Sequence, residues 1–135
     1  MRFEAPWFRS LARGREIWRP TVDLELDRIP QPLYFIVDTG ADISVAPKAL
    51  ADRMGLDWES GKKITMHGIS PKPECSVEGR IHEVTVRFVG PGVEHTVQMC
   101  FAEGDVPRLL GRLGLMPPFR VTFDADRRVT TFATE

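Results

Sequence analysis

One ten-residue stretch, residues 35–44, restricts the fold of this 135-residue chain more than any other. It reads FIVDTGADIS, so three apolar residues bring Asp38 to the end of an expected strand, and Thr39, Gly40 and Ala41 turn the chain directly afterwards. A carboxylate in this position costs stability unless it is hydrogen-bonded or used, because burial penalises its charged form. The stretch therefore predicts a strand and a turn that position one carboxylate, which is either hydrogen-bonded or functional.

The rest of the chain is patterned mainly as short strands. Val22, Leu24 and Leu26 alternate with acidic residues, which predicts a strand with one wet face. Residues 33–37 are apolar throughout, which predicts a strand covered on both sides. Further strands are expected at 62–66, 74–77, 84–88, 93–101, 119–124 and 128–132. A short helix is expected with Pro47 as its first residue and a cap at Gly55 and Leu56. The pattern predicts an all-β fold, a closed or nearly closed barrel with one or two short helices.

Charge and cysteine content exclude several functions. The 18 basic and 19 acidic residues nearly cancel, so no nucleic-acid partner is expected. No apolar run approaches the roughly 18 residues that span a bilayer, so we expect a cytoplasmic protein without a membrane partner. Cys75 and Cys100 are expected to be reduced thiols. The three histidines are too dispersed for a zinc site, and neither a metal nor a cofactor is expected.

Residues 1–19 form an N-terminal arm that no periodicity assigns, and residues 20–135 form the domain. The arm carries Phe3, Trp7, Phe8 and Trp18 among several arginines. The pattern favours an arm whose aromatic residues pack on the body or on a second subunit. The alternative is a segment that is removed or displaced on activation.

Two motifs give the chain a family resemblance. The tetrapeptide Asp38-Thr39-Gly40-Ala41 resembles the active-site motif of the retroviral-type aspartic proteases, the retropepsins. Downstream, residues 109–112 read LLGR and resemble the apolar-apolar-Gly-Arg segment that closes the same fold. The resemblance covers roughly residues 19–132, and the tail at 120–132 is more similar to cellular and retrotransposon-type members than to viral ones.

The resemblance implies an acid-protease barrel that hydrolyses peptide bonds with two carboxylates and a bound water. The chain has one Asp-Thr-Gly, so the second carboxylate is expected from another copy. The expected partners are therefore a second copy and a peptide or protein substrate. Asp38 is the expected catalytic acid and base, Thr39 the brace between subunits, and Gly40 a hydrogen-bonding group near the substrate.

The resemblance also assigns substrate contacts and one ion pair. The expected substrate-binding residues are Ile36, Ala41, Asp42, Gly68, Ile69 and Leu109. Gly68 and Ile69 belong to the tip of an expected flap, a hairpin over the substrate whose arms are 62–66 and 74–77. Asp42 is also expected to pair with Arg112 as a structural ion pair.

Two alternatives stay open from the residues themselves. Asp38 could instead be a structural aspartate that caps a turn, which is the commoner role of an aspartate that precedes a glycine. At the level of the whole protein, the alternative is a non-catalytic dimeric peptide-binding or assembly module on the same fold.

Overall fold

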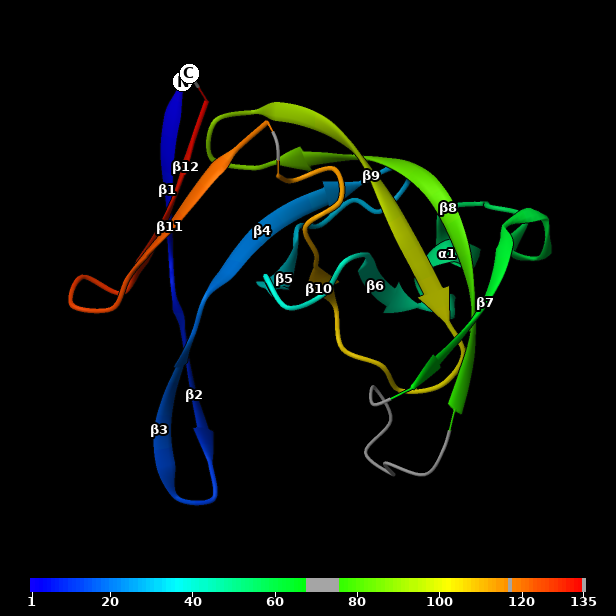
Figure 1. The fold of residues 1–135 in the computed structure, drawn as a ribbon, viewed down its shortest axis with the longest axis horizontal. Helices are drawn as coiled ribbons and strands as arrows, with labels where there is room; N and C mark the ends of the chain where they lie inside the picture. Colours follow the sequence, from blue (N-terminus) through cyan, green and yellow to red (C-terminus); the bar gives the residue numbers. More distant parts are fainter. Residues whose placement is uncertain (68–75, 117, 135) are drawn as a thin grey trace.

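The computed structural model describes residues 1–67, 76–116 and 118–134. Its elements run along the chain as Figure 1 shows. The strands are β1 (Arg2–Pro6), β2 (Phe8–Ala12), β3 (Arg15–Arg19), β4 (Thr21–Leu26), β5 (Leu33–Val37), β6 (Ser44–Pro47), β7 (Lys62–His67), β8 (Ser76–Phe88), β9 (Val93–Ala102), β10 (Leu109–Leu110), β11 (Arg120–Asp124) and β12 (Val129–Ala133). The helices are α1 (Lys48–Arg53) and the single 3-10 turn η1 (Trp58–Ser60). The expected all-β class with one or two short helices is confirmed.

Six strands close into a barrel. Their order is β4, β5, β10, β6, β9 and β8, and a β4–β8 pairing completes the ring. The pairs β5–β10 and β6–β9 are parallel and the others are antiparallel, so the barrel is mixed. Leu24, Phe35, Val86, Met99 and Phe101 are fully buried at its centre. The expected closed barrel is confirmed.

Strand β8 is longer than the sequence predicts. The expected break between the strands at 74–77 and 84–88 is wrong, because residues 76–88 form one strand of 13 residues, and residues 74 and 75 lie outside the described residues. One edge of β8 pairs with β7 near its start and with β4 near its end, while β9 pairs along the other edge from Gly79 to Phe88. Pairing on both edges holds the backbone extended through residues whose side chains show no clear alternation.

The apolar sequence of β5 predicts a strand covered on both sides, but the structure leaves one face partly exposed. Phe35 and Val37 are buried, but Leu33 and Ile36 are only half-buried and Tyr34 is 42% exposed. The outer face of β5 is therefore a surface on which other segments can pack, and the burial prediction for this strand is wrong.

The expected short helix is confirmed, with one change at its start. Pro47 is the N-cap and not the first helical residue, because its ψ of 144° is extended and it is still part of β6, opposite Ala102 of β9. At the other end the N–H of Gly55 donates to Asp52 O and that of Leu56 to Ala51 O. These two bonds form a Schellman cap, as the sequence predicts.

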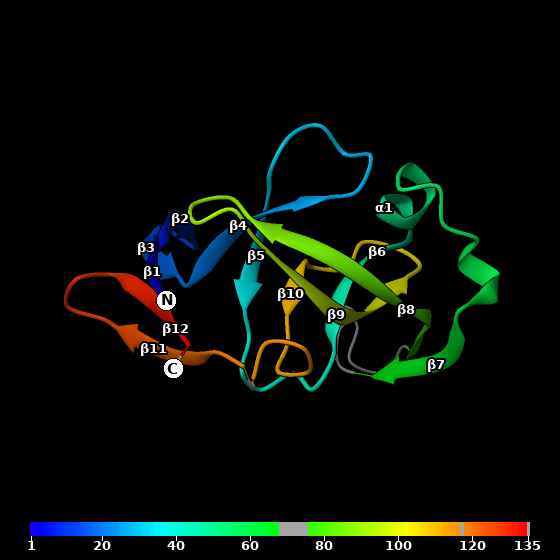
Figure 2. The same ribbon diagram turned by 90° about the horizontal axis from the view of Figure 1, so that it is seen from above.

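The first nineteen residues form three strands. β1 pairs with β12, which pairs with β11, so the two ends of the chain lie side by side in Figures 1 and 2. The Phe3 ring stacks on Phe132 at 4.9 Å and also contacts Phe88 and Phe119. β2 and β3 form a separate hairpin that projects from the body. In the described residues no helix is long and apolar enough to cross a membrane.

Candidate active site

Asp38 directly follows β5, at one end of the barrel. β5 is fixed on both sides here, because it pairs antiparallel with β4 and parallel with β10. The Asp38 N–H donates to Leu110 O at 3.0 Å, and the Ala41 N–H returns to Asp38 O at 3.2 Å. The Gly40 N–H donates to the Asp38 carboxylate at 3.0 Å. The turn therefore holds the backbone of Asp38 and one of its carboxylate oxygens in place.

The turn and the second motif interlock. The Arg112 N–H donates to Ala41 O and the Leu113 N–H to Asp42 O, both at 2.9 Å. Gly111 lies so close to the turn that a Cβ there would be 2.7 Å from the Ile43 carbonyl carbon and 2.9 Å from Ala41 O. Only a residue without a side chain fits between these backbones. Each motif therefore depends on the other for its geometry.

A side-chain pair links the same two segments. Arg112 Nη2 donates to Asp42 Oδ1. Both side chains are more than half exposed, so the pair orients the two groups more than it stabilises the fold. The Asp42 carboxylate is thereby engaged by a cation.

A groove of about 500 Å³ runs past the turn. This volume lies in the usual range of ligand sites, roughly 300–1,000 Å³. Asp38 and Asp42 are the acidic residues among the described residues that line it. Its lining is otherwise small or apolar, apart from one threonine: Gly40, Ala41, Ile43, Val45, Ile64, Thr65, Met66, Pro107 and Leu109. The groove can therefore receive an extended apolar ligand beside a carboxylate.

The structure brings together most of the sequence-predicted residues. Asp38, Gly40, Ala41, Asp42 and Leu109 all line the groove. The others are placed differently: Thr39 is exposed on the turn, and Ile36 is half-buried opposite Leu109 in the β5–β10 pair and does not line the groove. Gly68 and Ile69 lie outside the described residues.

Several groove residues are not apparent as site residues from the sequence. Val45 lies on β6, a four-residue strand that the sequence does not predict. Ile64 and Met66 lie on β7, and Pro107 precedes β10. Ile64 and Met66 alternate along an expected flap arm, and one face of such an arm must point toward the site. This alternation could have identified them as groove residues from the sequence.

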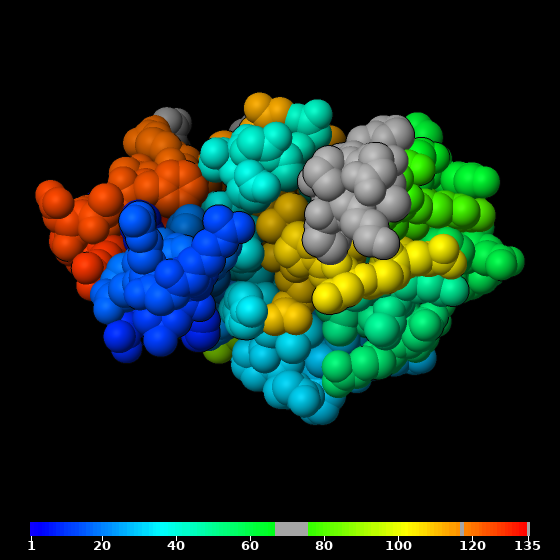
Figure 3. Space-filling view, turned by 90° about the horizontal axis from the view of Figure 1, so that it is seen from below, coloured from blue at the N-terminus to red at the C-terminus, as the bar shows by residue number. Residues whose placement is uncertain are grey.

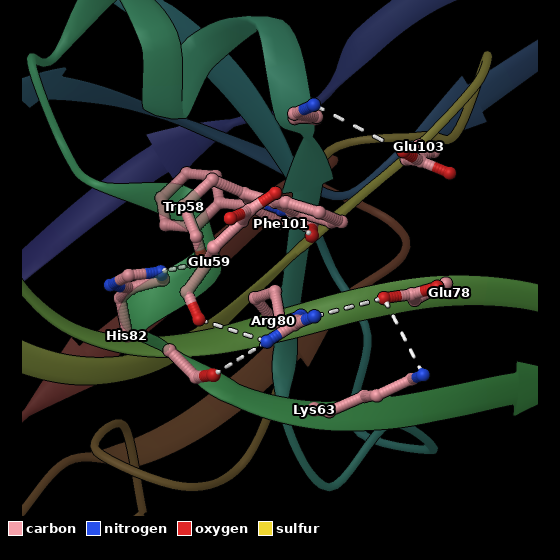
Figure 4. A network of polar contacts seen from close by, with 10 residues as sticks. Trp58, Glu59, Lys63, Glu78, Arg80, His82, Phe101 and Glu103 are labelled. Atoms are coloured by element: carbon pink, nitrogen blue, oxygen red, sulfur yellow. Dashed lines mark hydrogen bonds and ion pairs between the residues drawn. The ribbon is translucent and has the colours of Figure 1, made fainter.

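A polar network fixes the base of the β7–β8 hairpin (Figure 4). Ile64 and Met66 of this hairpin line the groove. Arg80 donates to Glu59 O at 2.9 Å and to Glu78 Oε1 at 3.2 Å, and its guanidinium lies over the Trp58 ring. Trp58 Nε1 donates to Phe101 O at 2.7 Å. One arm of the hairpin is thus tied through Arg80 and Trp58 to the core strand β9.

The fold and the groove define a class. A closed barrel that presents an Asp-Thr-Gly turn, interlocked with a Gly-Arg segment, is the architecture of an acid protease. In the described residues, no group of three His, Cys, Asp or Glu side chains is placed to hold a metal ion.

Comparison with known proteins identifies the family. Residues 22–115 match the aspartyl protease family. No curated protein matches the chain. Among solved structures, EIAV protease in complex with the inhibitor HBY-793 is similar at 31% identity and a TM-score of 0.47, covering 70% of this chain and 82% of that one. Because the family match spans more than half of its residues, the chain belongs to the aspartyl protease family, and its resemblance to the retropepsins is confirmed.

Proposed function

We propose that this aspartic protease is an endopeptidase that acts as a homodimer, with one Asp38 from each copy forming the catalytic pair. The carboxylates that line the groove are the observation that supports the proposal. Of the two carboxylates that the described residues place there, Asp42 is engaged by Arg112. A single chain therefore offers Asp38 alone, whereas hydrolysis without a metal or a nucleophilic side chain needs two carboxylates. A second copy supplies the other one.

The proposed chemistry shares one proton between the two Asp38 side chains. One carboxylate accepts a proton from a bound water as that water attacks the peptide carbonyl carbon. The other donates a proton to the carbonyl oxygen. The tetrahedral intermediate then breaks its C–N bond: the leaving nitrogen takes the proton that the first carboxylate accepted from water, and a hydroxyl proton of the intermediate passes to the second carboxylate, so the pair again holds one proton. No acyl-enzyme forms, because the nucleophile is water.

The neighbouring residues take supporting roles in this proposal. Thr39 is exposed on the turn, where its hydroxyl can reach the matching turn of the second copy. Gly40 already donates to the Asp38 carboxylate and fixes its orientation. Ala41 and Asp42 would bind the substrate backbone beside the scissile bond, and Gly68 and Ile69 would cover it from the flap.

The groove walls indicate apolar substrate side chains. Val45, Ile64, Met66 and Leu109 enclose the space beside Asp38. An apolar side chain that fills such a space gains about 1.5–3 kcal/mol from burial, whereas a charged one would lose its hydration. We therefore propose that apolar residues flank the bond that is cut, and that Ile36 acts behind Leu109 as a support.

Hydrolysis of a mixed peptide library between pH 4 and 7 tests the proposal. The wild type is expected to cut peptides and Asp38→Asn to cut none. Asp105→Asn is the matched control, since Asp105 is exposed in the loop before β10 and does not line the groove. Equal activity of wild type and Asp38→Asn would eliminate the protease. Peptide binding without any cleavage by the wild type would favour the alternative, a dimeric binding module.

A mixing experiment tests the shared pair. In a randomised equal mixture of wild type and Asp38→Asn, about a quarter of the dimers hold two Asp38 side chains, so activity per wild-type chain should halve. If the activity per wild-type chain does not change in the mixture, each chain acts alone and the shared pair is wrong. Sedimentation of Arg112→Ala in parallel tests the link of the Asp42–Arg112 pair to dimer formation, which we expect to weaken.

A further inference from the structure

The β2–β3 hairpin has two faces of different character. Its cross-strand register pairs Phe8 with Arg19, Ser10 with Ile17 and Ala12 with Arg15. Side chains directly opposite in an antiparallel pair share a face. The first face, which we call the basic face, therefore consists of Phe8, Ser10, Ala12, Arg15, Ile17 and Arg19. The second face carries the intervening residues Arg9, Leu11, Glu16 and Trp18.

The charges of the second face are paired within it. Arg9 Nε donates to Glu16 Oε2 at 2.9 Å, and Trp18 Nε1 donates to Glu16 Oε1 at 2.6 Å. Trp18 also lies under the Arg128 guanidinium at 4.0 Å. On the basic face, Arg15 and Arg19 form no ion pair with any described residue, nor does Arg13 at the turn. The basic face is thus an uncompensated cationic surface.

The basic face also has an apolar strip that the core does not cover. Phe8 is 48% exposed, and Ile17 is half-buried but lies outside the core cluster. A hollow at the turn end of the hairpin is lined by Ala12, Arg13, Arg15 and Ile17. Apolar surface with a charged rim is typical of an interaction site.

A stack of three side chains joins this face to the groove. The Phe8 ring lies parallel to the Tyr34 ring at 5.4 Å, and the Arg108 guanidinium covers Tyr34 at 4.5 Å. Arg108 Nε also donates to Tyr34 O at 2.8 Å. Pro107 and Leu109, the neighbours of Arg108, both line the groove. Figure 3 shows the blue hairpin beside the cyan residues of β5, with the yellow-to-gold segment before β10 next to them.

We propose that the basic face of the β2–β3 hairpin is a second substrate-binding surface, which holds an acidic segment of the substrate that also carries apolar or aromatic residues. Charge complementarity selects the acidic residues, and the strip of Phe8 and Ile17 takes the apolar ones. The stack of Phe8, Tyr34 and Arg108 connects the basic face to the groove. The acidic segment would therefore lie beyond the substrate residues that bind in the groove. The role in cleavage rests on the proposed function; the binding does not.

Paired peptide substrates test this inference. A core peptide cut by the wild type is extended, at each end in turn, by six residues that alternate Glu with Leu or by six that alternate Gln with Leu. The acidic extension is expected to lower KM about five-fold relative to the neutral one without changing kcat, and 0.5 M NaCl should remove the difference. Arg15→Glu and Arg19→Glu should each bring the KM ratio close to one. Arg53→Glu on α1 is the control, because it makes the same charge change away from the hairpin and should keep the ratio.

A binding measurement separates this inference from the proposed function. The fluorescein-labelled acidic extension alone should bind Asp38→Asn protein, as measured by anisotropy, and Arg15→Glu should weaken that binding about three-fold or more. If the peptides with the acidic and the neutral extension are cut with equal KM, the inference is wrong and the proposed protease function is unaffected. Binding without any cleavage supports the surface and overturns the protease. If Arg15→Glu instead shifts the dimer to monomer in sedimentation, the face is a contact between copies and the inference is wrong.

Discussion

The side-chain oxygen of Ser44 accepts a hydrogen bond from the backbone N–H of Gly111 at 2.9 Å, across 67 positions of the sequence. Both residues are buried. Ser44 begins β6, just after the Asp38 turn, and Gly111 follows β10. This bond therefore fixes the turn against the Gly-Arg segment from inside the protein, while the Asp42–Arg112 pair does so from outside.

Replacing Ser44 by alanine tests the inner link. Ser44→Ala leaves the Gly111 N–H buried without its acceptor, which should lower the free energy of unfolding by about 1–3 kcal/mol. Urea denaturation at a fixed protein concentration measures it, since dimer formation makes the midpoint depend on concentration. Ser60→Ala, at an exposed hydroxyl, is the control. An unchanged midpoint for Ser44→Ala would contradict the role of this bond.

Replacing Gly111 by alanine tests the close approach of the two motifs. The added Cβ would lie within 3 Å of backbone atoms of Ile43 and Ala41, which cannot move aside as a flexible side chain can. We expect a loss of about 2–3 kcal/mol in unfolding free energy and a loss of peptidase activity larger than the unfolded fraction explains. Gly90→Ala is the control, because a Cβ there meets nothing within 4 Å. Full activity of Gly111→Ala would show that the motifs do not need this spacing.

Phe3 tests whether the N-terminal arm is part of the folded body. Its ring joins the aromatic cluster of Phe88, Phe119 and Phe132. Phe3→Ala should therefore cost roughly 2–4 kcal/mol of unfolding free energy, measured by urea denaturation. Phe123→Ala, at a ring that is 40% exposed, should cost much less. Equal effects of the two substitutions would mean that β1 does not dock on the barrel as described.

Cys100 gives a prediction about alkaline pH. Burial raises the pKa of the Cys100 thiol to about 11, because the thiolate would lose its hydration. In the unfolded chain the thiol ionises at lower pH, so unfolding releases a proton and stability falls as pH rises from the ordinary thiol pKa toward 11. In a Cys75→Ser background, Ellman's reagent at pH 8 should react slowly with native protein and rapidly in urea. Equally rapid labelling of the native protein would show that the thiol is accessible.

The burial of a strand's two faces was predictable where the sequence alternates clearly and not where it does not. β4 has three apolar residues that alternate with acidic ones, and the structure buries all three. β5 is apolar at every position, so its sequence does not reveal that Tyr34 faces outward. The Tyr34 ring on that face contacts the Phe8 ring and the Arg108 guanidinium. Burial on the second face of a strand depends on which distant segment packs there.

The groove was predictable in its centre and not in its walls. Asp38, Gly40 and Asp42 lie within one turn, so a local motif identifies them together. Val45, Met66 and Pro107 come from three separate segments that only the pairing of distant strands brings to the same place. Their residue types are common in any β core, and nothing in their local sequence marks them.

The sequence by itself determined the local features of this protein: a strand that ends in a carboxylate, the turn after it, and the cap of helix α1. Each depends on residues a few positions apart, whose side chains and φ/ψ preferences act directly on one another. Only the tertiary structure decided that residues 76–88 form one strand, that β1 completes a sheet with β12, and that the β2–β3 hairpin contacts β5 through Phe8 and Tyr34. These depend on backbone hydrogen bonds between distant strands, and such bonds are nearly the same for every residue type.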